Sequence, residues 1–140
     1  MSDKNNPVVS DIKLHVVWHT TKNLPLLTPT IKQRLRQILR QDCTQKGIQI
    51  MSGGKITVNF VHMIVICPPR TAPSEMVRQF KGRSSRLLRQ EFSELLDYNS
   101  DSSLWDSGYF CKSFGDVSPE MLEDYIDNKS RSASASGFHP

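Results

Sequence analysis

The sequence predicts an α+β protein in which one antiparallel sheet carries helices on one side. Two observations lead to this fold class. Segments whose apolar residues alternate, as in strands, are interspersed with segments whose apolar residues recur at helical spacing, in the order βαββαβα. The chain has 140 residues, of which 37% are hydrophobic, enough for one domain with one core.

The first expected strand is KLHVVWHT, residues 13–20. Successive side chains of a strand point to opposite faces, so this segment has an apolar set and a second set that contains two histidines. The first set is Leu14, Val16 and Trp18, and the second is His15, Val17 and His19.

Residues 27–47 are expected to form the first helix. Thr28 can cap its start, Pro29 suits its first turn, and Gly47 can end it. Its apolar stripe is Ile31, Leu35, Ile38 and Leu39, and its basic residues outside the stripe are Lys32, Arg34, Arg36 and Arg40.

The second half of the chain continues the alternation of strands and helices. Two strands, 48–52 and 55–66, flank Gly53-Gly54, a pair typical of a hairpin turn. The later elements are a helical region at 74–92 with a candidate bend at Gly82, a short strand or strand pair at 104–114, and a last helix at 118–129 with Ser118 as its cap and Pro119 at its first position.

The two ends differ from this pattern. Residues 1–11 are expected to form a flexible arm, and residues 130–140 a disordered tail, because the tail is small, polar and low in complexity. The domain is therefore expected to span residues 12–129.

The composition predicts a cytoplasmic protein without a membrane partner. The start of the chain is polar and acidic, unlike a signal peptide. The longest apolar run, FVHMIVI, is too short to span a bilayer. The odd number of widely spaced cysteines, Cys43, Cys67 and Cys111, indicates reduced thiols and no disulfide framework.

A net charge of +4 and a pI near 9.1 favour an anionic partner. The segment FKGRSSR combines cations and hydroxyls, which suit contacts with DNA phosphates. A solvated helix face is the other interpretation of the same residues. The candidate DNA-binding residues are Lys81, Arg83, Ser84, Ser85 and Arg86.

Five stretches of the chain together resemble one family. HVVWHTTKNLPLL, VHMIVICPP, VRQFKGRSSRLL, LWDSGYF and EDYIDN occur in the same order and at similar spacing in the single-tyrosine HUH transposases of the 200/605 insertion-sequence type. The resemblance covers about residues 13–128. It implies a ferredoxin-like sheet, dimers whose sheets join, binding to hairpin DNA, and cutting and rejoining of single-stranded DNA in transposition.

The resemblance also implies a catalytic tyrosine. In the family a tyrosine on the last helix attacks a phosphate and leaves a 5′-phosphotyrosine link, and Tyr125 falls on that position. The residues alone permit a second interpretation, in which Tyr125 is a core residue. It shares one helical stripe with Met121, Leu122 and Ile126.

The metal-binding positions that the resemblance implies are mostly replaced. The family holds Mg²⁺ or Mn²⁺ with a His–hydrophobic–His pair and with a Gln on the tyrosine helix. His62 falls on the second His, although a lone strand His is more often bonded to a backbone carbonyl. Phe60 stands at the first His and Lys129 at the Gln. A phenyl ring has no lone pair and a protonated lysine only donates, so we expect no metal cofactor in the protein as written.

Three functional hypotheses follow from these residues. The first is a relative that binds hairpin or single-stranded DNA as a homodimer, with tyrosine-mediated cleavage impaired by the lost ligands. The second is an active transposase with an altered metal site. The third is a ferredoxin-like interaction domain without nucleic acid. Because Phe60 and Lys129 lie in different parts of the chain, a misplaced register does not account for both replacements. Lys129 is four residues after Tyr125, so its ammonium is expected on the same helix face.

Overall fold

The computed structural model describes residues 11–97, 104–113, 115 and 118–138, without the side chains of residues 97 and 129–138. The described part follows the predicted order βαββαβα. Its elements are β2 (Ile12–His19), α1 (Pro29–Lys46), β3 (Gln49–Ile56), β4 (Phe60–Cys67), α2 (Pro73–Glu91), β5 (Phe110–Ser113) and α3 (Pro119–Phe138), with short 3-10 turns at Thr21–Asn23 and Ser93–Asp97.

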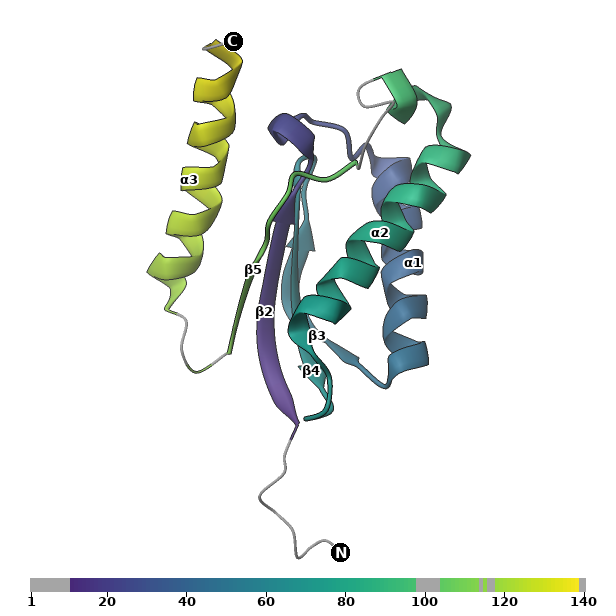
Figure 1. The fold of residues 1–140 in the computed structure, drawn as a ribbon, viewed down its shortest axis with the longest axis vertical. Helices are drawn as coiled ribbons and strands as arrows, with labels where there is room; N and C mark the ends of the chain where they lie inside the picture. Colours follow the sequence, from purple (N-terminus) through teal and green to yellow (C-terminus); the bar gives the residue numbers. More distant parts are fainter. Residues whose placement is uncertain (1–10, 98–103, 114, 116–117, 139–140) are drawn as a thin grey trace, which may run out of the picture.

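The strands form one antiparallel sheet in the order β3-β4-β2-β5. This order gives the ferredoxin-like arrangement and confirms the predicted fold class. Helices α1 and α2 lie side by side on one face, and α3 lies beyond the other face (Figure 1). Among the described residues, no helix is long and apolar enough to cross a membrane.

The core lies between the sheet and the two paired helices. The apolar set of β2 predicted from alternation is buried there, and Trp18 is fully buried against Phe80 and Trp105, with ring centroids 6.1 and 5.8 Å away. Burial of one such large side chain contributes roughly 1.5–3 kcal/mol. The same set on β4 is Val61, Met63, Val65 and Cys67.

The helix ends follow the predicted capping chemistry. The Thr28 hydroxyl accepts a hydrogen bond from the Ile31 backbone N–H at 3.4 Å, and Gly47 ends α1 with a φ of 69°. The Ser118 hydroxyl accepts from the Met121 N–H at 3.2 Å. The backbone of α3 continues to Phe138, past the boundary expected at residue 129.

The glycines at 53–54 and at 82 do not have the structural roles predicted from the sequence. Gly53 and Gly54 lie inside β3 at a register irregularity, and the hairpin turn is at residues 57–59, where the Thr57 N–H donates to the Phe60 carbonyl at 2.9 Å. The expected hairpin turn at the glycine pair is therefore wrong. Helix α2 also runs through Gly82 without a break, since an isolated glycine weakens a helix without ending it.

The cysteine thiols of the described chain are free. Burial is the main cause that raises the pKa of Cys43 to about 12 and that of Cys111 to about 11, and it also raises the pKa of Cys67. These thiols are therefore protonated near neutral pH and take part as apolar packing groups.

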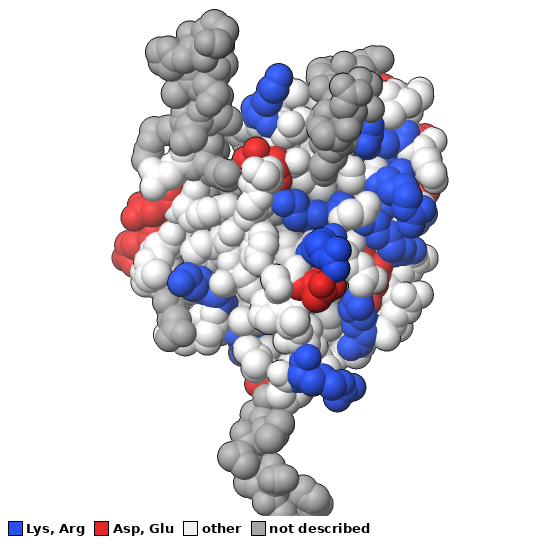
Figure 2. Space-filling model, in the orientation of Figure 1, with Lys and Arg blue, Asp and Glu red and all other residues white. Residues whose placement is uncertain are grey.

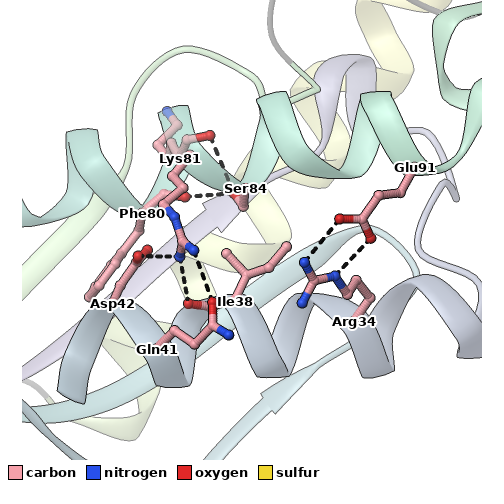
Figure 3. Close-up of polar contacts among 9 residues, drawn as sticks. Arg34, Ile38, Gln41, Asp42, Phe80, Lys81, Ser84 and Glu91 are labelled. Atoms are coloured by element: carbon pink, nitrogen blue, oxygen red, sulfur yellow. Dashed lines mark hydrogen bonds and ion pairs between the residues drawn. The ribbon is translucent and has the colours of Figure 1, made fainter. Parts of the chain in front are cut away.

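A polar clamp joins α1 to α2 through Arg83, and its partners Gln41 and Asp42 are labelled in Figure 3. Its Nη1 donates to Asp42 Oδ1 at 2.6 Å, and its Nη2 donates to Gln41 Oε1 at 2.9 Å. Asp42 is fully buried, and burial raises its pKa in opposition to the guanidinium. A second, more exposed pair joins Arg34 and Glu91 at 2.7 Å (Figure 3), and exposed pairs of this kind contribute only about 0–1 kcal/mol.

We expect Arg83→Met to lower the free energy of unfolding by about 3 kcal/mol, because it leaves the buried Asp42 carboxylate without its counter-charge. Thermal unfolding followed by circular dichroism measures the change. Arg86→Met is the matched control, since Arg86 is exposed on the same helix, and its effect should stay within about 0.5 kcal/mol. Asp42→Asn combined with Arg83→Met should recover part of the loss. Equal unfolding midpoints for the two single variants would contradict the clamp.

Candidate functional site

Most residues of the segment predicted to contact DNA make hydrogen bonds or ion pairs within the protein. Lys81 Nζ donates to the carbonyls of Asp106 and Gly108 at 2.8 and 2.9 Å, which fastens the loop before β5 to α2. Arg83 belongs to the clamp with Asp42. These two cations therefore have structural partners, and their role as DNA ligands stays a prediction.

The two serines of this segment are buried. The Ser84 hydroxyl donates to the Phe80 carbonyl at 2.6 Å and accepts from Trp105 Nε1 at 2.9 Å. The Ser85 hydroxyl accepts from the Leu104 N–H at 2.9 Å. Both hydroxyls face the protein interior, which does not support the predicted phosphate contacts for Ser84 and Ser85. Arg86 alone of the five predicted residues has an exposed side chain.

Other basic residues gather on the outer side of the paired helices. Figure 2 shows Lys and Arg concentrated on the side of the molecule where α2 lies in Figure 1. The exposed arginines of α1 and α2 are Arg36, Arg40, Arg78 and Arg86. Arg78 forms an ion pair with Glu75 at 2.6 Å, which leaves the other three as the stronger candidates for phosphate contacts.

The positions that the family resemblance implies as metal ligands on β4 lie on the opposite face of the sheet, away from the core. Phe60 and His62 share that face because strand residues two apart point the same way. The register pairs Phe60 with His19 and His62 with Val17. The face therefore receives its side chains from β2 as well as from β4.

His62 contacts His15, which the sequence analysis did not connect with it. His15 Nδ1 lies 3.1 Å from His62 Nε2, and the ring planes are within 16° of parallel. The ring centroids are 5.3 Å apart, close to the largest separation that a 3.1 Å nitrogen contact allows. The rings thus meet edge to edge, and one N–H donates to the other nitrogen.

Both imidazoles are neutral at pH 7. Burial lowers the pKa of His15. Burial, followed by the charges of His15 and Lys55, lowers the pKa of His62 to about 4. The expected alternative, a His62 bonded to a backbone carbonyl, is therefore replaced by a bond to another imidazole.

Tyr125 lies on the same side of the sheet as Phe60 and His62. Its ring centroid is 5.0 Å from that of Phe110 and 5.9 Å from that of His19. His19 in turn lies 5.5 Å from Phe60, centroid to centroid. Tyr125 is therefore part of an aromatic group that includes the Phe60 position, and its side chain is half-buried. Lys129, expected beside it, has its side chain outside the described residues.

The residues present do not fit the divalent ion that the family resemblance implies. Phe60 offers no lone pair, and His62 Nε2 faces His15 Nδ1. In the described ranges, no three His, Cys, Asp or Glu side chains lie close enough to hold a metal ion. Catalytic sites for divalent ions normally use about three protein ligands.

Sequence reasoning missed His15 and His19 as members of this group. Alternation along β2 indicated that they share a face, but nothing local to β2 shows which strand lies beside it. The contact joins positions 47 residues apart in the chain. Only the sheet order, with β2 next to β4, brings them together.

The family model and the similar curated proteins agree on one protein family. The family model described as "Transposase IS200 like" matches residues 8–129. The ISDra2 transposase TnpA of Deinococcus radiodurans is 21% identical over 126 residues, which cover 90% of this chain and 89% of that protein. The transposase for insertion sequence element IS200 of Salmonella typhimurium is 24% identical over 117 residues, covering 84% and 76%.

Two solved structures resemble the fold. A putative transposase from Deinococcus radiodurans has a TM-score of 0.77 at 23% identity, over 86% of this chain and 92% of that chain. A REP-associated tyrosine transposase bound to a REP hairpin has a TM-score of 0.56 at 12% identity, over 85% and 64%. Both support the sheet order and the placement of the helices described above.

The lowered pKa of His62 predicts a loss of stability in mild acid. The unfolded state binds the proton near pH 6.5 and the folded state only near pH 4, so the contribution is complete above pH 6.5 and is lost as the pH falls from 6.5 towards 4. Between pH 6.5 and 5 the free energy of unfolding should fall by about 2 kcal/mol from this group. Urea unfolding across this range measures it, with His62→Gln as the control. The same pH slope in both proteins would contradict the prediction.

Proposed function

Because this chain belongs to the IS200-like transposase family, we propose that it binds hairpin or single-stranded DNA as a homodimer and that its tyrosine-mediated cleavage of single-stranded DNA is impaired. The match over residues 8–129 supports a DNA-directed role over an interaction domain without nucleic acid. The similar transposase bound to a REP hairpin supports a hairpin as the DNA form. Three free thiols in the described chain suit a cytoplasmic protein.

One position carries the proposal of impaired cleavage. A phenyl ring occupies the place of the first metal-binding His, where it packs against His19 near Tyr125. Without an ion to polarise the phosphate, the phenol lacks the electrophilic assistance that its chemistry needs. Tyr125 keeps the position of the nucleophile and can still contact DNA.

An active transposase with an altered site is the second candidate. The observation in its favour is His15, which places a second imidazole 3.1 Å from His62. Its in-line bond to His62, however, directs the two nitrogens at each other instead of at a common third atom. We therefore prefer the impaired relative.

We expect labelled hairpin DNA to form a complex with the protein in chelator as well as in Mg²⁺ or Mn²⁺, with no covalent band on denaturing gels. Complex formation should weaken steeply with salt, since phosphate contacts release counterions. Tyr125→Phe serves as the control for any band that does appear. An efficient band that needs Tyr125 and disappears with chelator would establish the second candidate, and absence of any complex would exclude DNA binding to such hairpins.

The proposed homodimer would join two sheets at β5. This strand is an outer strand of the sheet, and its second edge pairs with no other strand of the described chain. Joining two copies there removes an exposed edge. Light scattering at micromolar concentration should return twice the chain mass of 15.9 kDa. A result equal to one chain would count against the dimer.

A further inference from the structure

The sheet face opposite the core is basic and carries no acid from the strands. Registers β2–β4, β2–β5 and β3–β4 define which strand residues point to this face. They are Lys13, His15, Val17 and His19 on β2, Gln49, Met51 and Lys55 on β3, Phe60, His62, Ile64 and Ile66 on β4, and Phe110 and Lys112 on β5. The set contains three lysines and no carboxylate.

Four of these residues form a row across all four strands. Lys112 on β5 pairs in register with His15 on β2. His15 bonds to His62 on β4, and His62 pairs in register with Lys55 on β3. We call these four residues the Lys–His row. Its two ammonium groups flank two buried imidazoles.

The glycine pair of β3 places Lys55 in this row. A regular ladder continued from the Met51–Ile64 pair would set Lys55 opposite Phe60, but the irregularity shifts Lys55 to His62. Glycine is required at residue 54, because an added Cβ would lie 2.3 Å from the His62 carbonyl oxygen. Lys55 Nζ still lies 5.9 Å from the Phe60 ring centroid, so the side chain stays on this face.

The ammonium groups of Lys55 and Lys112 are available to a ligand. Both side chains are exposed, and neither has an ion pair within the described residues. The imidazoles between them stay uncharged: Lys55 is among the causes that lower the pKa of His62, and no carboxylate is among the causes for either histidine. Two cations without an ion pair in the described residues, on strands that present no carboxylate to this face, favour an anion that accepts hydrogen bonds.

We propose that the Lys–His row is a metal-independent binding site for a DNA phosphate, on the face of the sheet that carries Tyr125. This proposal rests on the DNA binding argued above and adds where one backbone segment lies. Lysine binds phosphate as a point charge and needs no fixed fork geometry. Lys55, beside Phe60, supplies positive charge at the position where the family resemblance implies an ion.

The test has two measurements on the full chain in chelator. In the first, inorganic phosphate is titrated while NMR follows the ring signals of His15 and His62. Saturable shifts are expected in the unaltered protein, and at least tenfold weaker binding is expected in the double variant Lys55→Gln, Lys112→Gln. The matched control is Arg36→Gln, Arg86→Gln, which removes two exposed cations from the helix side and should leave these shifts unchanged.

The second measurement is the salt dependence of binding to hairpin DNA with a single-stranded flank. The double lysine variant should lower the slope of log K against log salt by about 0.7, the value for one phosphate contact on a single strand. Its unfolding midpoint should match that of the unaltered protein, since both lysines are exposed. If the double lysine variant shows the same histidine shifts and the same slope as the unaltered protein, the Lys–His row is not the proposed phosphate site. If no DNA binds at all, the proposed function fails, and the phosphate titration still decides the row by itself.

Discussion

The antiparallel pairing of β2 with β4 is the constraint on which the other features depend. It runs from Ile12 opposite Cys67 to His19 opposite Phe60. Because side chains alternate, one register sends Val16 and Trp18 into the core and His15 to the other face. A slip by one residue would exchange the two sets, so the energy of the apolar core also holds the histidines and Phe60 in place.

Helix α2 shows how a basic segment can serve the fold first. Lys81 and Arg83 are charged, yet one fastens a loop and the other clamps the buried Asp42. The adjacent serines hold Leu104 and the Trp105 indole. A segment rich in Arg and Ser therefore has two physical explanations, and burial distinguishes them: the exposed Arg86 remains available to a partner, and the serines do not.

The other sheet face differs in chemistry from the metal site that its family resemblance implies. Phe60 offers no lone pair where that resemblance implies a ligand, and the edge-to-edge bond between His15 and His62 engages one nitrogen of each ring. Positive charge remains on the face through lysine side chains. Ammonium groups can hold a phosphate, but they lack the Lewis acidity of a divalent ion.

The sequence by itself determined the order of elements, the caps at Thr28, Gly47 and Ser118, the apolar set of β2, and the absence of a lone-pair donor in the Phe60 side chain. These features depend on residue type and on spacing along the chain, which are local. The tertiary structure alone decided the contact of His15 with His62, the burial of Ser84 and Ser85, and the clamp from Arg83 to Asp42. Each joins or buries groups through elements that are distant in the chain, and periodicity carries no information on which strands or helices become neighbours. The hairpin turn predicted at Gly53-Gly54 was wrong for the same reason. A glycine pair suits both a hairpin turn and an irregularity within a strand, and only the pairing of β3 with β4 distinguishes the two.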